Sequence, residues 1–187
     1  MPEEYHFEEH FEHLHTLDGM EYERCSFAHC DLSATGLSGK KFIDCSFVQC
    51  NLSMAKIQQT VFRTVNFESS KLLGLHFEQC SPIGLSISFQ DCQLDHSSFE
   101  RCKLSESNFI NCRLLECDFS GAELKGSKWH HSDLSGAVFE NCNLTQADFS
   151  KAEHYSLNPG NNRIKNAIFS LEGLPGLLAH YGIKIVS

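Results

Sequence analysis

A five-residue repeat runs through most of the chain, and no other feature limits the possible folds as strongly. A large apolar residue returns at every fifth position from Tyr22 to Phe77 and, after a shift of two, from Phe89 to Phe149. In the second run, aromatic and leucine centres alternate without a break. A repeat this short cannot bury an apolar face alone, so successive repeats must stack on one another. The sequence therefore predicts a solenoid.

The alternation of centres predicts how the repeats stack. With five residues on each face and four faces in each turn, residue i lies above residue i−20, and like side chains lie over like. Leucines then form columns on two opposite faces, and aromatic columns on the other two include Phe89, Phe109, Trp129 and Phe149. Parallel turns at the strand spacing of about 4.8 Å hydrogen-bond to the turns on both sides. We therefore expect an all-β, quadrilateral parallel β-helix of about six to seven turns over residues 17–152, roughly 30 Å long.

Nine of the ten cysteines take the position two residues before a repeat centre, where Ala and Ser also occur, and Cys80 takes the equivalent position before Pro82. Cysteine at such a position behaves as a small interior residue. Pairs twenty residues apart, such as Cys25 and Cys45, would lie about 5 Å apart, within reach of a disulfide. Because one small-residue position accounts for every cysteine and a reducing compartment is expected, we predict buried free thiols.

The net charge of −9 is unevenly distributed. Residues 1–23 carry eight acidic residues and no Lys or Arg, residues 24–90 carry four acidic and six basic residues, and residues 91–151 carry ten acidic and six basic residues. The sequence holds no basic patch suited to nucleic-acid phosphates. No apolar run approaches the roughly 20 residues of a transmembrane helix, and the acidic start differs from a signal peptide. We expect a cytoplasmic protein that binds neither nucleic acid nor membrane.

Two segments interrupt the repeat. Between Phe77 and Phe89 lie two residues more than two repeats require, including Pro82 and Gly84. This break at 81–88 is either a tolerated insertion or a projecting contact element. Residues 1–16 are acidic and rich in histidine, and we expect them to form a polar cap over the first turn. The segment contains His6, His10, His13 and His15. If it were helical, the spacings of four and three residues among them would let histidines converge on a metal ion. We favour the cap and predict no metal site.

The repeat leaves little room for catalysis. Phe and Leu columns fill the interior, and burial disfavours the thiolate form of the cysteines. The convex outside of a rod offers no pocket in which a base and a nucleophile converge. We therefore predict neither an enzyme nor a cofactor site.

Several runs resemble the A(D/N)LXX consensus of pentapeptide-repeat proteins. They are CDLS at 30–33, CNLS at 50–53, CDFSGA at 117–122 and ADFS at 147–150. The resemblance covers residues 15 to 152. It implies a right-handed quadrilateral β-helix, in agreement with the stacking argument.

Residues 153–187 resemble the closing module of the subgroup that includes the quinolone-resistance and microcin-immunity pentapeptide proteins. The resemblance lies in LNPGNNRIKNA at 157–167, FSLEGLPGLL at 169–178 and YGIKI at 181–185. It implies a short helix plus strand through which two rods join end to end. Pro175 suits the first turn of this helix and Gly182 suits its end. We predict one domain that forms a homodimer, rather than a monomer with a simple cap, and an interface made by Leu174, Leu177, Leu178, Tyr181 and Ile183.

The resemblance to this subgroup also implies mimicry of duplex DNA. Its members dock an acidic rod on the DNA-binding saddle of DNA gyrase and protect the enzyme from poisons. Residues 91–151, beside the predicted joint, have a net charge of −4, so a dimer would concentrate about eight negative charges around its centre. Five basic residues interrupt this surface: Arg101, Lys103, Arg113, Lys125 and Lys128. The acids predicted to bind the partner are Asp95, Glu100, Glu106, Glu116, Asp118, Glu123, Asp133 and Glu140.

Two functions remain open on the sequence alone. The quinolone-protective members carry projecting loops, one of them long, whereas this chain has only the small break at 81–88. Protection of gyrase or a related type II topoisomerase from another poison, as an immunity factor, fits this smooth rod better. The alternative is a generic interaction scaffold whose partner is not a topoisomerase. Dimerisation would favour the first function and a monomeric rod the second.

Overall fold

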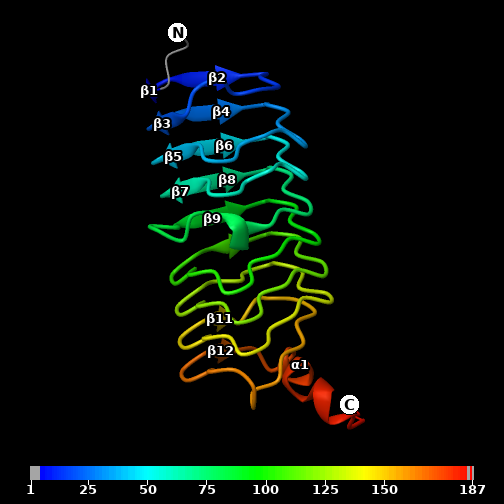
Figure 1. Ribbon diagram of the computed structural model, residues 1–187. Coiled ribbons are helices and arrows are strands. Elements are labelled where there is room, and N and C mark those ends of the chain that lie inside the picture. The colour runs from blue at the N-terminus through cyan, green and yellow to red at the C-terminus, as the bar shows by residue number, and fades with distance from the viewer. Residues whose placement is uncertain (1–4, 185, 187) are drawn as a thin grey trace.

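The computed structural model describes residues 5–184 and 186, and it folds them into one elongated rod (Figure 1). The chain winds through about eight turns of a parallel β-solenoid. The first described residues lie at one end of the rod and the C-terminal helix at the other. The predicted right-handed quadrilateral β-helix is confirmed.

Short parallel strands mark some faces of the turns, and isolated bridges join the others. The strands form a four-stranded sheet in the order β1-β3-β5-β7, a six-stranded sheet in the order β10-β9-β8-β6-β4-β2, and the pair β11-β12. The elements are β1 (Tyr5–Phe7), β2 (His10–Glu12), β3 (Glu21–Glu23), β4 (Ser26–Ala28), β5 (Lys41–Ile43), β6 (Ser46–Val48), β7 (Val61–Arg63), β8 (Val65–Glu68), the 3-10 helix η1 (Phe77–Gln79), β9 (Ile87–Gln90), β10 (Phe109–Ile110), β11 (Asp148–Phe149), β12 (Ile168–Phe169), α1 (Leu174–Leu178) and the 3-10 helix η2 (Ala179–Tyr181).

Aromatic rings form columns along the inside of the rod. The rings of Phe109 and Trp129 stack with their centroids 4.3 Å apart, and those of Phe99 and Phe119 stack at 4.9 Å. Rings of different columns meet edge to face, as Phe119 and Trp129 do at 5.1 Å. All four side chains are fully buried. Because burying one large apolar side chain contributes roughly 1.5–3 kcal/mol, these columns supply much of the stability of the rod.

All ten cysteines are buried free thiols. Several Sγ atoms donate to backbone carbonyls of the preceding turn, as Cys45 does to Tyr22 O at 3.3 Å and Cys142 to Phe119 O at 3.0 Å. Desolvation raises the pKa of Cys45 to about 11. At neutral pH such a thiol stays protonated and is a poor nucleophile or metal ligand.

Most corners of the turns have a residue with positive φ, two positions after the repeat centre. Glycine takes this position at Gly121 and Gly136, with φ of 70° and 71°, but Glu116 and Asn141 adopt it too, with φ of 53° and 57°. A left-handed backbone costs a residue with a Cβ roughly 1–2 kcal/mol. The corner N–H compensates in part because it donates to the next turn, as Glu116 N–H does to Ser135 O at 2.9 Å.

The β-helix extends beyond the expected bounds of 17–152. At its start, β1 and β2 pair with β3 and β4, so the expected cap forms a turn of the solenoid. Tyr5 pairs with Glu21, sixteen residues away, whereas Glu21 pairs with Lys41, twenty residues away. The first turn is therefore four residues shorter than the next and does not follow the five-residue period. At the other end β12 pairs with β11, and Phe169 stacks on Phe149 at 5.4 Å.

The break at 81–88 follows η1 and ends within β9. The spacing between paired residues grows there from twenty to twenty-two, because Phe47 pairs with Phe67 but Phe67 pairs with Phe89. The two extra residues leave the loop outside the rod, with Ile83 82% exposed. The aromatic column continues past the loop, since the rings of Phe67 and Phe89 stack at 5.4 Å.

Candidate protein-interaction surfaces

From η1 to the last turn, the rod has four faces, and we name each after one inward-facing residue. They are the Phe89 face (Phe89, Phe109, Trp129, Phe149), the Leu94 face (Leu94, Leu114, Leu134), the Phe99 face (Phe77, Phe99, Phe119, Phe139) and the Leu104 face (Leu104, Leu124, Leu144). Outward residues stack in columns between these centres. On the Leu94 face, for example, parallel bridges join Gln93, Arg113, Asp133 and Glu153 in one column.

Acidic residues gather on two adjacent faces. From Glu78 to Glu153, the Leu94 and Phe99 faces together carry eight carboxylates and two guanidinium groups, a net charge of −6. We call these two faces the acidic stripe; its charged residues are Glu78, Asp95, Glu100, Arg101, Arg113, Glu116, Asp118, Asp133, Glu140 and Glu153. The Leu104 face carries two acids and four bases between Lys103 and Lys165. The rod is therefore polarised across its axis.

The structure places six of the eight predicted acids in this stripe. They are Asp95, Glu100, Glu116, Asp118, Asp133 and Glu140. Glu106 and Glu123 lie instead on the Leu104 face, where Asn143 Nδ2 donates to Glu123 Oε2 at 2.7 Å. The eight predicted acids therefore do not form one surface.

Asp95 differs from the prediction in another way. It was expected to point outward, but it is only 6% exposed. Its carboxylate forms an ion pair with Arg113 at 2.5 Å and accepts the Leu115 backbone N–H at 3.2 Å. Asp95 is thus neutralised within the rod and offers a partner little free charge.

Two acids of the stripe were missed by the sequence prediction. Glu78 follows Phe77 in η1, and Glu153 bridges to Asp133 across one turn. Glu78 was missed because the break obscures its place in the repeat. Glu153 was missed because the repeat was expected to end at residue 152, and the pairing of residues twenty positions apart is the signal that would have found it.

Hydrogen bonds hold part of the stripe in its charged form. Burial, the largest single influence on Asp133, raises the pKa of its carboxyl group, but hydrogen bonds from Ser135 and His154 outweigh it and lower the pKa. The same hydrogen bond, from His154 Nδ1 to Asp133 Oδ1 at 2.9 Å, raises the pKa of His154. Asp133 is therefore ionised at neutral pH.

The C-terminal helix packs against the last turn through two glycines. A Cβ at Gly176 would lie 2.1 Å from the carbonyl oxygen of Tyr155, and one at Gly173 would lie 2.0 Å from its hydroxyl oxygen. Pro175 stands in the first turn of α1, and Gly182, with φ of 63°, ends η2, as the sequence predicted. Residues 182–184 form no strand, and Ile185 lies outside the described residues.

The predicted dimer residues make an apolar surface around α1. Leu177 packs partly against the core, while the other four are 36–63% exposed: Leu174, Leu178, Tyr181 and Ile183. Ile168 and Leu171, which were not predicted, are also exposed, at 52% and 81%.

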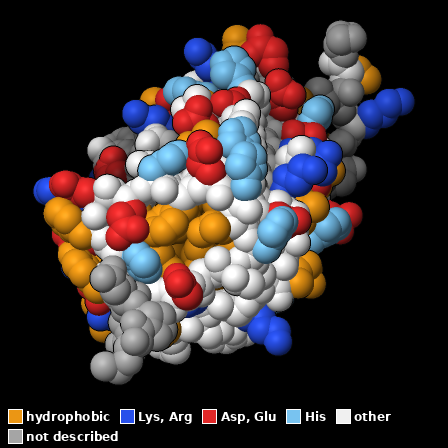
Figure 2. Space-filling view, turned by 90° about the horizontal axis from the view of Figure 1, so that it is seen from above, with side chains coloured by type: hydrophobic (Ala, Val, Ile, Leu, Met, Phe, Trp, Pro, Cys, Tyr) orange, Lys and Arg blue, Asp and Glu red, His pale blue; other side chains and the backbone are white. Residues whose placement is uncertain are grey.

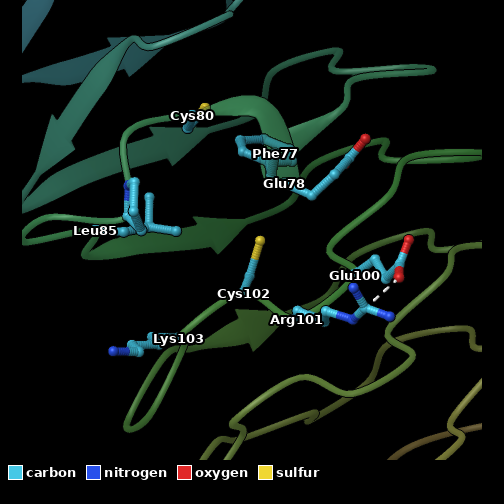
Figure 3. Close-up of a pocket in the computed structure, with 9 residues that line it drawn as sticks. Phe77, Glu78, Cys80, Leu85, Glu100, Arg101, Cys102 and Lys103 are labelled. Atoms are coloured by element: carbon cyan, nitrogen blue, oxygen red, sulfur yellow. Dashed lines mark ion pairs between the residues drawn. The ribbon is translucent and has the colours of Figure 1, made fainter.

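A cavity of about 270 Å³ opens beneath the break (Figure 3). Phe77, Leu85 and the thiol of Cys102 line it, and the ion pair of Glu100 and Arg101, at 3.3 Å, lies at its edge. Burial raises the pKa of Cys102 to about 12, so this thiol is unsuited to nucleophilic chemistry at neutral pH.

The described part of the histidine-rich segment is not helical. Because residues 5–12 form strands rather than a helix, histidines three and four residues apart do not converge. Within the described residues, no group of three or more His, Cys, Asp or Glu side chains is placed to hold a metal ion. Nor does any helix of this part of the chain have the length and apolar character needed to cross a membrane.

Comparison with known proteins agrees with this architecture. The family profile of the pentapeptide repeat region matches residues 20–98, 70–149 and 93–169. The chain belongs to the pentapeptide-repeat family. No curated protein sequence matches it.

Two solved structures illustrate the likeness. HetL, a pentapeptide repeat protein involved in heterocyst differentiation regulation from the cyanobacterium Nostoc sp. strain PCC 7120, matches with a TM-score of 0.63 and 15% identity, over 90% of this chain and 84% of that chain. Full-length QnrB1, a plasmid-mediated fluoroquinolone resistance protein, matches with a TM-score of 0.47 and 20% identity, over 96% of this chain and 100% of that chain. The likeness to HetL supports the β-helical fold.

Proposed function

We propose that this protein is a DNA mimic that binds a type II topoisomerase, such as DNA gyrase, and protects the enzyme from a poison. The acidic stripe carries this proposal. Its carboxylates are held on a rigid rod, on two adjacent faces, next to the end that bears α1. A surface that binds the phosphate backbone of DNA would meet an excess of negative charge there.

The charge spacing of the stripe is close to that of one DNA strand. The stripe spans four turns, or about 19 Å at the usual strand spacing. A net charge of −6 over this length gives one negative charge per roughly 3 Å, against about 3.4 Å for each strand of B-DNA. The Leu104 face has net positive charge and lies opposite the Leu94 face, so the field of the rod would orient it on a basic groove.

Dimerisation through the C-terminus would double this stripe. The exposed apolar side chains of Leu174, Leu178 and Tyr181 lie just beyond the last acidic turn. Joining two copies there would bury these side chains and place two acidic stripes near the joint. The proposed dimer would then offer a longer imitation of duplex DNA, in the cytoplasm where the enzyme works.

A supercoiling assay tests this function. We expect the protein to restore gyrase supercoiling in the presence of a peptide poison or a fluoroquinolone, at concentrations that leave the unpoisoned enzyme active. The double variant Glu116→Lys/Asp118→Lys reverses two charges of the stripe and should need roughly tenfold more protein for the same rescue, because screened charges at an interface contribute modestly.

A matched variant controls for net charge. Glu106→Lys/Glu123→Lys changes the charge by the same amount on the Leu104 face and should rescue as the parent does. Equal loss in both double variants would show that net charge, not the stripe, drives binding. Failure of the parent to rescue at micromolar protein would refute the topoisomerase proposal.

A scaffold with a different protein partner is the second candidate. The exposed Ile83 at the break favours it, because a single projecting apolar side chain has no counterpart in the DNA duplex. Pull-down with the parent and with Ile83→Ser distinguishes this partner from a topoisomerase.

A further inference from the structure

At the end of the rod opposite α1, a second binding surface is open. We propose that this N-terminal end binds a basic, extended polypeptide segment, which pairs with the outer edges of β1 and β2 as an additional strand layer of the solenoid. The proposal is independent of the topoisomerase function. It rests on three features of the end: open strand edges, an uncovered aromatic stack and an excess of carboxylates.

Among the described residues, no strand pairs with the outer edges of β1 and β2. β1 is the outermost strand of the four-stranded sheet and β2 the outermost strand of the six-stranded sheet. In later turns, the residue before each centre donates its N–H to the preceding turn, as Ser26 does to Glu9 O at 2.9 Å and Lys41 to Met20 O at 2.8 Å. Tyr5 and His10 hold this position in the first described turn, so their N–H groups face the open edge. Such edges bind extended peptides by strand addition.

The aromatic columns also end here without a cover in the described part of the chain. Phe27 is stacked between Phe11 and Phe47, at 5.1 and 4.5 Å, but Phe11 has a stacked ring on one side only. His6 likewise stacks on Tyr22 at 4.9 Å. Figure 2, seen from this end, shows an apolar area surrounded by histidine and acidic side chains. An incoming apolar or aromatic side chain would continue either stack.

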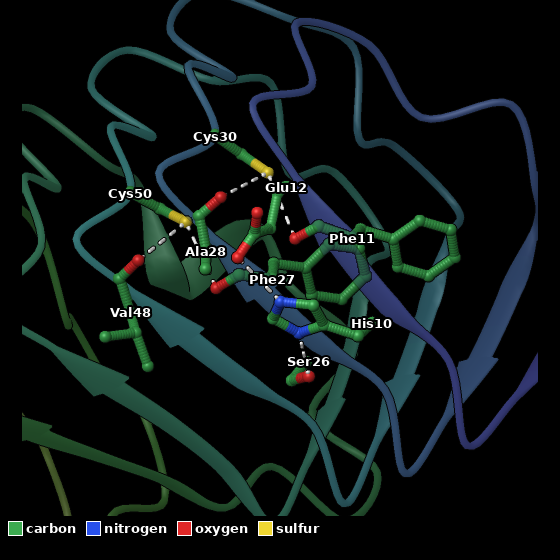
Figure 4. Close-up of polar contacts among 9 residues, drawn as sticks. All are labelled: His10, Phe11, Glu12, Ser26, Phe27, Ala28, Cys30, Val48 and Cys50. Carbon is green, nitrogen blue, oxygen red and sulfur yellow. Dashed lines mark hydrogen bonds and ion pairs between the residues drawn. The ribbon is translucent and has the colours of Figure 1, made fainter.

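The negative charge of this end favours a basic partner. Residues 5–23 contain six acids and no Lys or Arg. Only Glu8 and Glu21 have basic partners among the described residues, Arg24 and Lys41. Others contact uncharged or titratable groups, as Glu12 does through His10 Nε2 at 3.0 Å; His10 Nδ1 also contacts Ser26 (Figure 4).

A second copy of this chain is a poor occupant for the same reason. An end-to-end contact of two such ends would bring twelve carboxylates together, twice the six of one end. Like charges facing each other across an interface cost several kcal/mol, so a basic segment is favoured.

The rod contains a template for this recognition. The acidic strand β3 is paired with β5, and Phe42 of β5 stacks on Tyr22 at 5.3 Å. In the same pair, Lys41 Nζ lies 2.8 Å from Glu21 Oε2. The strand that pairs with acidic β3 therefore has an aromatic side chain pointing inward and, next to it, a basic side chain pointing outward. We expect the partner segment to carry this pattern.

A peptide that copies β5 tests the proposal. The probe is a labelled synthetic peptide of residues 38–44 (SGKKFID) added to the full chain, and fluorescence anisotropy reports binding. The same peptide with both lysines replaced by glutamate should not bind. Hydrogen exchange should slow at the amide of Tyr5 or of His10 when the probe binds, and not around α1.

Two protein variants locate the site. Glu9→Lys/Glu12→Lys should weaken probe binding roughly tenfold, as expected for the loss of two partly exposed ion pairs. Glu116→Lys/Asp118→Lys, on the acidic stripe, makes the same charge change and should leave probe binding intact. Equal weakening by both variants, protection elsewhere than β1 and β2, or no binding at about millimolar probe would each overturn the proposal.

Discussion

Replacing Phe119 by alanine tests whether the aromatic columns hold the rod together. Phe119 is completely buried, and its ring stacks between Phe99 and Phe139, 4.9 and 5.0 Å away. It also meets Phe109 and Trp129 edge to face, at 5.8 and 5.1 Å. The substitution removes all four contacts and leaves a cavity between rigid turns that cannot close it.

The expected loss of unfolding free energy is about 3–5 kcal/mol, the range for Phe→Ala in a packed core. For a chain of this length, each kcal/mol lowers the melting temperature by about 2–4 °C, so the melting temperature of Phe119→Ala should fall by about 6–20 °C. Thermal unfolding followed by circular dichroism measures this directly.

Val138→Ala is the matched control. Val138 precedes Phe139 on the same face, but it points outward and is 42% exposed. Its truncation should change the unfolding free energy by less than about 0.5 kcal/mol. If Phe119→Ala melted within about 2 °C of the parent, or if both variants lost the same stability, the inward and outward positions would be wrongly assigned.

Three further predictions concern the C-terminal helix, the thiols and a surface ion pair. Gly176→Ala should loosen α1, because its Cβ would meet the Tyr155 carbonyl oxygen at 2.1 Å, and limited proteolysis should then cleave the C-terminus faster than in the parent. A thiol reagent such as DTNB should label none of the ten cysteines in the folded protein at pH 8 and all ten in guanidinium, because every one is buried. The raised pKa of His154 and the lowered pKa of Asp133 make their pair stabilising at mildly acidic pH; this contribution disappears as pH rises through the folded pKa of His154 or falls through that of Asp133. NMR titration of His154 should show its pKa fall to the ordinary value in Asp133→Asn.

The five-residue period was enough to predict the β-helix, because a residue and its neighbour twenty positions later must share a column. The same rule assigns Glu106 and Glu123 to the Leu104 face, although the sequence prediction treated all eight acids as one surface. The burial of Asp95 could not be predicted in this way. It depends on an ion pair with Arg113, eighteen residues away, and therefore on side-chain conformation as well as on the column.

The two ends of the rod were harder to predict than its middle. The first turn is four residues short, which hides His6 and Phe11 as repeat centres. At the other end Tyr155 and Leu157 are buried out of phase with the repeat, so the last turn also escaped the five-residue pattern. At both ends the buried residues are out of phase with the five-residue repeat, so periodicity alone does not predict which residues are buried there.

The loop at the break has a consequence for how this rod can change. The turns before and after it remain stacked although the register grows from twenty to twenty-two residues. In a solenoid each turn contacts only its neighbours, and doubling the length of a flexible loop costs only about 0.6 kcal/mol. A foreign segment grafted between Pro82 and Gly84 would therefore be displayed at mid-length with the acidic stripe unchanged. The sequence and length of this loop can therefore vary while the charged surface of the rod stays the same.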